Sequence, residues 1–182
     1  MKHVSSANAV RIVGGRWRSR RLRFPDRLGL RPTPDRVRET LFNWLGQDLT
    51  GRRCLDLFAG SGALGFEAAS RGAARVVLVE QDAAALAALR ENKTVLAATA
   101  VEVVRADALA WLAATPESFD LIFLDPPFAT GLLPAALAAA ATHLAPGGRI
   151  YAEFGAPPDL AGWRVLREGR AGQSHFCLLE LA

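Results

Sequence analysis

The sequence is poor in cysteine and histidine, and this shortage narrows the kinds of site it can hold. It has two cysteines and three histidines among 182 residues. Cys54 and Cys177 lie far apart in apolar runs, without a Cys-x-x-Cys spacing. His3, His143 and His175 show no metal-ligand spacing. We therefore expect reduced, buried cysteines, as in a cytoplasmic protein, and no metal site.

Long apolar segments are also missing. Residues 132–141 are apolar but too short to span a bilayer, and a proline interrupts them. The first ten residues lack the apolar core of a signal peptide. These features predict a cytoplasmic protein with no membrane partner.

Lysine is nearly absent, because it occurs only at positions 2 and 93. The 22 basic residues are therefore almost all arginine, and with 18 acidic residues the net charge is +4. This balance modestly favours a polyanionic partner, and the planar guanidinium group suits phosphates and base edges. A genomic composition bias explains the arginine content equally well.

Length and composition favour one soluble domain. A chain of 182 residues with 51% hydrophobic and 22% charged residues can bury one sizeable core. We expect a single domain over 1–182, with a basic arm at 1–31, a helix at 33–46 and an α/β core at 52–182.

The core begins with a buried strand at 54–58 that runs through a glycine turn into a helix. Gly60 and Gly62 permit a tight turn and close approach of a ligand, and Gly65 permits close packing of the helix. The spacing Gly-x-Gly-x-x-Gly also matches a dinucleotide site, and a turn without a ligand has to be considered as well.

Asp56 favours a cationic ligand at this turn. A carboxylate there would repel a pyrophosphate but attract an ammonium group. The run Asp56-x-Phe58-x-Gly60-x-Gly62 is similar to the first motif of Rossmann-like methyltransferases, which implies S-adenosyl-L-methionine as the cofactor. Alternatively, Asp56 caps local backbone donors.

Two further strands are expected at 75–80 and 101–105; the first ends in Glu80, and Asp107 follows two residues after the second. Glu80 can accept hydrogen bonds from both ribose hydroxyls of a nucleoside. Asp82 is expected to cap the helix at 83–97. Asp107 can accept from the adenine amino group, with the Ala108 amide reaching the ring, or it can cap the next helix.

A strand at 119–124 leads into Asp125-Pro126-Pro127-Phe128, the most informative tetrapeptide. The prolines end the strand and remove backbone donors. The Asp125 carboxylate and the Pro126 carbonyl remain as acceptors that can hold the two hydrogens of an exocyclic amine. Phe128 offers a face on which a base can stack. These three residues are our candidate catalytic group, and a purely structural turn is the alternative.

Before the core, the basic arm places arginines around Trp17 and Phe24. Residues 10–14 and 20–24 are expected to form a hairpin across Gly14-Gly15. The arginines would contact phosphates and an aromatic ring would stack on a base, whereas a flexible solvated arm is the alternative. The candidate RNA-binding residues are Arg16, Arg18, Arg20, Arg31 and Arg36.

The helix at 33–46 has strong start signals, with Thr33 as its N-cap, Pro34 as its first residue and Asp35 in its first turn. One apolar stripe should pack on the core, leaving an adjoining face that could border cofactor or substrate. The stripe consists of Val37, Leu41, Trp44 and Leu45, and the adjoining face of Arg36, Glu39 and Asn43.

The rest of the chain predicts a helix at 132–144, closed by Pro-Gly-Gly at 146–148, and a strand at 149–154. Strands at 163–168 and 173–181, joined by a loop at 169–175, should form an antiparallel pair that completes the sheet.

Together, several motifs closely resemble the bacterial 16S ribosomal RNA guanine-N2 methyltransferases. The resemblance covers residues 10–181 and rests on 11–17, 30–33, 35–43, 56–65, 125–128 and 171–174. It implies a seven-stranded, mostly parallel sheet of order 3-2-1-4-5-7-6, with helices on both faces and the last strand antiparallel. It also implies a monomeric enzyme that methylates one guanine of 16S ribosomal RNA in the small ribosomal subunit.

Two other functions have to be considered. A DNA or other amino methyltransferase, acting on adenine N6 or cytosine N4, uses a similar Asp-Pro-Pro-aromatic turn, but no target-recognition domain is apparent. A non-catalytic RNA-binding module would not need Asp56, Glu80, Asp107 and Asp125 together.

Overall fold

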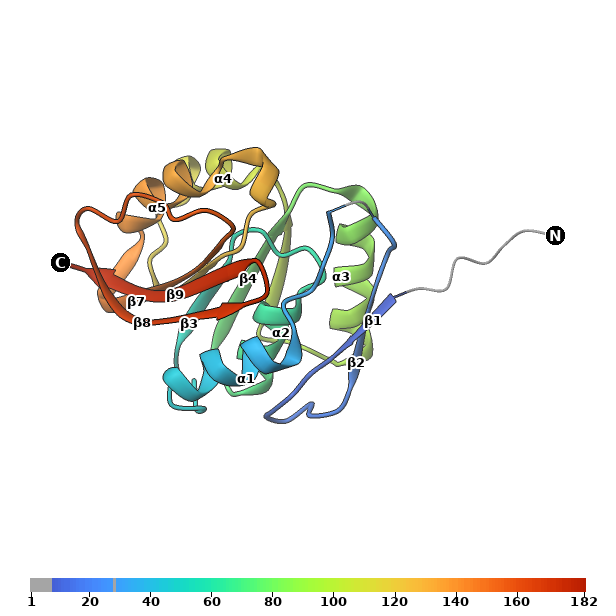
Figure 1. Ribbon diagram of the computed structural model, residues 1–182. Helices are drawn as coiled ribbons and strands as arrows, with labels where there is room; N and C mark the ends of the chain where they lie inside the picture. The colour runs from blue at the N-terminus through green and yellow to red at the C-terminus, as the bar shows by residue number, and fades with distance from the viewer. Residues whose placement is uncertain (1–7, 28) are drawn as a thin grey trace.

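The computed structural model describes residues 8–27 and 29–182. His3 and Lys2 lie outside these residues. The described chain forms a seven-stranded sheet with helices on both faces and a separate two-stranded hairpin at one side (Figure 1). This is the α/β arrangement that the sequence predicts.

Five parallel strands form most of the sheet. They are β3 (Arg53–Asp56), β4 (Arg75–Glu80), β5 (Val101–Arg105), β6 (Phe119–Leu124) and β7 (Leu144–Phe154). The sheet order is β5-β4-β3-β6-β7-β9-β8, which reads 3-2-1-4-5-7-6 when β3 is counted as the first core strand. Strands β3 and β6 are neighbours at the point where the order reverses, which is where open α/β sheets bind ligands.

The last two strands are β8 (Trp163–Ala171) and β9 (Ser174–Leu181). Strand β9 lies between β7 and β8 and is antiparallel to both. The predicted loop at 169–175 is wrong, because pairing continues to Ala171↔Ser174 and only two residues turn the chain. Gly172 makes this tight turn possible with φ +59°.

Side chains of the central strands alternate between two apolar layers. Cys54, Val76 and Leu78 face one layer, whereas Leu55 and Val77 face the other. The first layer contains residues of α1 (Asp35–Trp44), α2 (Ala63–Ser70) and α3 (Ala83–Val95). The second contains residues of α4 (Ala108–Ala114) and α5 (Leu133–Ala141), which lie at the top of Figure 1. Both cysteines are free and buried.

The boundary between α5 and β7 differs from the prediction. Helix α5 ends at Ala141, and β7 already begins at Leu144. The Pro-Gly-Gly run at 146–148 therefore lies inside β7, where the register shifts between Phe119↔Leu144 and Leu121↔Arg149. A bulge, rather than a loop, absorbs these residues.

The N-terminal hairpin is folded against the core. It consists of β1 (Asn8–Arg11) and β2 (Arg21–Phe24), so its first strand ends earlier than predicted. The Asn92 side chain on α3 accepts from the Arg23 amide at 3.1 Å and donates to the Arg23 carbonyl at 2.8 Å. The alternative of a flexible arm is therefore wrong for the described part of residues 1–31.

Candidate active site

The glycine turn joins β3 to α2 as predicted, although β3 ends at Asp56 and the turn begins at Leu57. Gly60 and Gly62 have φ +54° and +79°. A Cβ atom on Gly65 would lie 2.1 Å from Leu78 Cδ2, so only glycine lets α2 pack this closely on β4. Phe58 is half-buried and packs on the second apolar layer.

Two carboxylates accept hydrogen bonds from backbone amides of this turn. Asp56 Oδ2 accepts from the Gly65 amide at 3.0 Å, and Glu80 Oε2 accepts from the Gly60 amide at 2.8 Å. Glu80 Oε1 accepts from the amides of Gln81 and Asp82 at 2.9 and 2.8 Å. Asp56 therefore accepts from a local backbone donor, as in the alternative interpretation. It also lies at the glycine turn, as predicted.

Asp56 is only 1% exposed. Burial raises the pKa of its carboxyl group to about 7; the Gly65 hydrogen bond lowers this pKa and the charge of Glu80 raises it. A cation placed here would relieve this unfavourable burial of negative charge.

Asp107 follows β5 and caps α4, because its Oδ1 accepts from the Ala110 amide at 2.9 Å. The carboxylate remains exposed, and the buried Ala108 is the first residue of α4. Asp82 caps α3 as predicted by accepting from the Ala85 amide at 2.8 Å. The Asp107 side chain therefore has a structural role, and its contact with adenine stays a prediction.

The Asp125 turn lies beside the glycine turn. Asp56 pairs with Phe123 across β3 and β6, and the Leu57 amide donates to the Phe123 carbonyl at 3.2 Å. Burial raises the pKa of Asp125 well above its usual value, and the charges of Glu153 and Asp56 add to this effect.

Beyond Asp125, Pro126 is buried and Pro127 is exposed. Phe128 begins the short 3-10 helix η1 (Phe128–Thr130) and is 51% exposed. Large aromatic side chains are usually more buried than this. The exposed part of the ring is available for stacking on a base.

Glu153 on β7 is the functional candidate that sequence reasoning missed. It is 7% exposed, and three hydroxyl groups surround its carboxylate. Ser174 Oγ donates to Oε1 at 2.8 Å, Tyr151 Oη donates to Oε2 at 3.1 Å, and Thr33 Oγ1 lies 3.4 Å from Oε2. Thr33 Oγ1 also lies 3.4 Å from Asp125 Oδ2 and so links the two carboxylates.

Thr33 does not cap the helix, contrary to the prediction. Pro34 occupies the N-cap position without a side-chain hydrogen bond, and α1 begins at Asp35. The Thr33 hydroxyl instead lies within hydrogen-bond distance of the carboxylates of Asp125 and Glu153. The motifs at 30–33 and 171–174, which support the family resemblance, therefore meet at the Asp125 turn.

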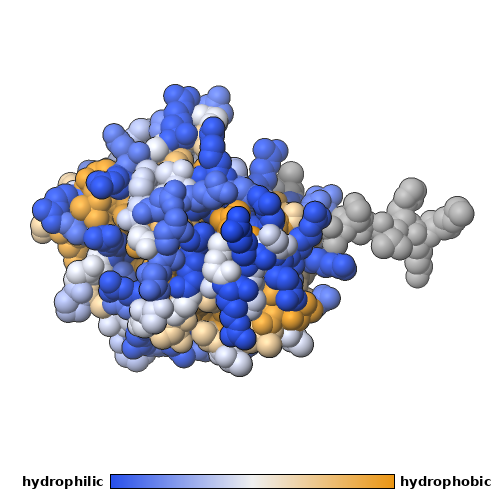
Figure 2. Space-filling view, turned by 90° about the horizontal axis from the view of Figure 1, so that it is seen from below, coloured by the Kyte–Doolittle hydropathy of each residue, from blue (hydrophilic) through white to orange (hydrophobic). Residues whose placement is uncertain are grey.

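The candidate RNA-binding arginines are all exposed. Arg16, Arg18 and Arg20 lie on the connection between β1 and β2, whereas Arg31 and Arg36 lie on either side of the start of α1. This connection and α1 are at the bottom of Figure 1, and the view from below is largely hydrophilic (Figure 2). The predicted stacking of a base on Trp17 or Phe24 is wrong, because both rings belong to the core at 8% and 5% exposure.

A buried ion pair fixes the connection between β1 and β2. The side chains of Arg38 and Glu67 are both 0% exposed, and Arg38 Nη1 lies 3.0 Å from Glu67 Oε2. Glu67 also accepts from the amides of Val13 and Gly14 at 2.9 and 2.8 Å, and Arg38 donates to the carbonyls of Arg11 and Thr33 at 2.7 and 2.9 Å. Glu67 and Arg38 thus tie the N-terminal segment to the core.

Within the described residues, no cluster of three histidine, cysteine or acidic side chains could hold a metal ion. None of the helices in 8–27 and 29–182 is long and apolar enough to cross a bilayer.

Comparison with known proteins confirms the family resemblance. Residues 10–180 match the family described as conserved hypothetical protein 95. The chain is 44% identical to ribosomal RNA small subunit methyltransferase D of Escherichia coli strain K12, over 97% of this chain and 92% of that protein. It is 40% identical to the protein of the same name from Haemophilus influenzae, over 94% and 95% of the two chains.

The fold is also similar to that of a solved methyltransferase structure from Escherichia coli. The two chains share 44% identity with a TM-score of 0.87, over 96% of this chain and 98% of the other. The sheet, its helices and this similarity identify the fold as that of the class I methyltransferases.

Proposed function

The chain belongs to the conserved hypothetical protein 95 family, and from this premise we propose that it methylates the exocyclic N2 of a guanine in 16S ribosomal RNA. The names of its relatives support a methyltransferase acting on ribosomal RNA of the small subunit. The observation that carries the choice of an amine is the Asp125 turn, which offers acceptors and lacks proline N–H donors.

The residues at the glycine turn suit S-adenosylmethionine better than a dinucleotide. The carboxylates of Glu80 and Asp56 lie at this turn, where they accept from the Gly60 and Gly65 amides, and their negative charge would repel a pyrophosphate. The same carboxylates favour a ligand with an ammonium and a sulfonium group. When bound, the cofactor supplies an electrophilic methyl group; Asp56, Glu80, Asp107 and the Ala108 amide are the proposed contacts.

The Asp125 turn would orient the target amine. The Asp125 carboxylate and the Pro126 carbonyl accept its two hydrogens, which directs the nitrogen lone pair toward the methyl group, while Phe128 stacks on the base. Positive charge develops on the nitrogen during transfer, and the negative charge of Asp125 stabilises it. The proton then leaves to water, so no covalent enzyme intermediate is needed.

The product decides between this function and its alternatives. The protein is incubated with labelled S-adenosylmethionine and small ribosomal subunits, or free 16S RNA, from cells that lack the enzyme. The RNA is then digested to nucleosides, and we expect N2-methylguanosine. N6-methyladenine or N4-methylcytosine, in RNA or in a parallel DNA reaction, would instead support another amino methyltransferase, and no product would support an RNA-binding module.

Glu80→Ala should weaken binding of S-adenosylmethionine by about 1.5 to 3 kcal/mol, the range for hydrogen bonds to a charged group. The variant should remain folded, since Glu80 is only partly buried. Calorimetric titration measures the affinity, and a thermal melt serves as the control. Unchanged affinity in a folded variant would remove Glu80 from the cofactor site.

Neutralising Arg16, Arg18, Arg20 and Arg21 together should weaken RNA binding and reduce its dependence on salt, because fewer counterions are released from the phosphates. Affinity for S-adenosylmethionine should stay nearly constant. RNA binding measured at several salt concentrations tests this, and an equal salt slope in both proteins would show that these arginines do not contact RNA.

Glu153→Gln should shift the pH dependence of single-turnover methyl transfer to lower pH. Transfer requires ionised Asp125, whose raised pKa means that activity is lost as the pH falls. Removing the negative charge of Glu153 lowers this pKa, so activity persists to lower pH. The control Ser174→Ala removes a hydrogen bond to Glu153 but keeps the charge, and it should not produce this shift. A profile identical to that of the parent protein would exclude this coupling.

A further inference from the structure

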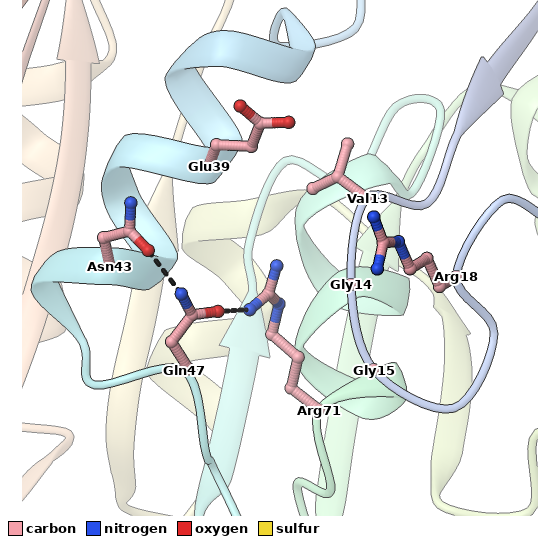
Figure 3. A pocket seen from close by; sticks show the side chains of 8 residues that line it. All are labelled: Val13, Gly14, Gly15, Arg18, Glu39, Asn43, Gln47 and Arg71. Carbon is pink, nitrogen blue, oxygen red and sulfur yellow. Dashed lines mark hydrogen bonds between the residues drawn. The ribbon is translucent and has the colours of Figure 1, made fainter.

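A cavity of about 470 Å³ lies between α1 and the connection that joins β1 to β2 (Figure 3). It is separate from the Asp125 turn and the glycine turn, since none of their residues lines it. Its lining residues are Val13, Gly14, Gly15, Arg18, Glu39, Asn43, Gln47 and Arg71. Polar and charged side chains therefore dominate its walls.

One wall is held in place by the protein itself. Gln47 donates to Asn43 Oδ1 and accepts from Arg71 Nη1. The Arg71 side chain is 6% exposed, lies 3.0 Å from Glu67 and stacks over the buried Phe42 ring at 4.6 Å. Because Glu67 and Phe42 hold the Arg71 side chain in place, this wall of the cavity is ordered before any ligand binds.

The remaining polar groups are free to meet a ligand. Asn43 uses its oxygen for Gln47, which leaves its amide nitrogen as a donor. The Glu39 carboxylate makes no hydrogen bond or ion pair within the described residues and points across the cavity in Figure 3. Arg18 faces it from the opposite side.

Glu39 restricts what the cavity can hold. A carboxylate repels a phosphate placed directly against it, but it accepts hydrogen bonds from base N–H groups. Among the four RNA bases, only guanine carries two adjacent donors, N1–H and N2–H, which one carboxylate can accept together. Its O6 is an acceptor beside them, and the Asn43 amide is a donor.

We propose that this cavity binds an unpaired guanine nucleotide of the RNA substrate, with Glu39 and Asn43 contacting the base and Arg18 the phosphate. The inference rests on the proposed function and concerns a nucleotide other than the methylated one. Thr33 beside Asp125 precedes α1, and Asn43 lies near its far end. A helix of 10 residues spans about 15 Å, roughly the length of four stacked nucleotides. One RNA strand could therefore reach both sites.

Binding of the four 5′-mononucleotides, measured by NMR titration, tests the proposal. S-adenosylhomocysteine is kept saturating, so that nucleotides cannot enter the adenine site. We expect 5′-GMP to bind more tightly than AMP, CMP and UMP. Glu39→Ala should weaken GMP binding by about tenfold or more, as expected for lost hydrogen bonds to a charged group, and should abolish the preference. Arg18→Ala should weaken all four nucleotides alike.

Matched substitutions control for charge. Glu91→Ala on α3 and Arg167→Ala on β8 remove the same charges from exposed positions outside the cavity, and both should bind GMP like the parent protein. Phe128→Ala separates the target site from the cavity, since GMP bound in the cavity should persist in this variant.

Two results would overturn the proposal. One is a guanine preference that survives in Glu39→Ala but is lost in Phe128→Ala, which would place GMP at the target site alone. The other is no preference for GMP in the parent protein. Failure to form N2-methylguanosine would count against the proposed function, yet the mononucleotide titrations would still be interpretable.

Discussion

Asp125→Ala is expected to reduce methyl transfer by about a hundredfold or more, the usual loss when one preorganised electrostatic group is removed. Binding of S-adenosylmethionine should be retained, because the substitution leaves Asp56, Glu80 and the glycine turn in place. It also removes one of two like-charged carboxylates that share the Thr33 hydroxyl, so the fold should not lose stability. Single-turnover methylation of small-subunit RNA and calorimetric titration of the cofactor measure the two effects separately.

Asp125→Asn provides the matched control. Its amide oxygen can still accept one hydrogen from the target amine, but it lacks the negative charge, so activity should lie between those of the parent and the alanine variant. Full activity in Asp125→Ala would contradict the assignment of this turn to the amine. Equal loss of cofactor binding and transfer would place Asp125 in the cofactor site instead.

Glu67→Ala is expected to lower the free energy of unfolding by about 3 to 5 kcal/mol, the cost of removing one partner of a buried ion pair. Arg38 would stay buried with its guanidinium lacking its main partner; burial already lowers the pKa of this group, and Glu67 opposes that effect. The amides of Val13 and Gly14 would also lose their acceptor. Unfolding by urea, followed by tryptophan fluorescence, measures the change.

Two variants make this stability test specific. Glu67→Gln keeps the volume and an acceptor oxygen, and so should cost less than the alanine variant. Arg164→Ala breaks the exposed pair with Glu180 and should change stability by at most about 1 kcal/mol. If Glu67→Ala cost no more than Arg164→Ala, the buried pair would not stabilise the fold.

The elements that sequence predicted well are those whose cause is local. Strand β4 has only apolar residues between its two ends, and in β6 only Asp120 interrupts the apolar run, so both strands have the predicted bounds. The glycine turn follows from backbone conformations that other residues rarely adopt. Asp82 caps α3 because its side chain reaches an amide three residues later.

The errors arise where a distant partner outweighs local preference. Thr33 has the local signature of an N-cap, but Asp125 and Glu153, far along the chain, engage its hydroxyl. Glu153 lies in a strand in which nothing marks it as functional, since two of its three hydroxyl partners, Thr33 and Ser174, lie outside that strand. Trp17 is surrounded by arginines in the sequence, yet its ring enters the core. Only the fold supplies these neighbours.

The hydroxyl partners of Glu153 lie far apart in the sequence, which affects the order in which the protein folds during translation. Thr33 precedes Glu153 by 120 residues, and Ser174 follows it by 21. During translation the ribosome delivers these segments in order, so the carboxylate emerges before the strand that carries Ser174 can pair with β7. The contact with Thr33 spans 120 residues, and folds rich in such non-local contacts form slowly. A nascent chain can therefore pair the five parallel strands before Ser174 reaches Glu153. If the proposed function holds, we expect activity only after β9 has paired with β7.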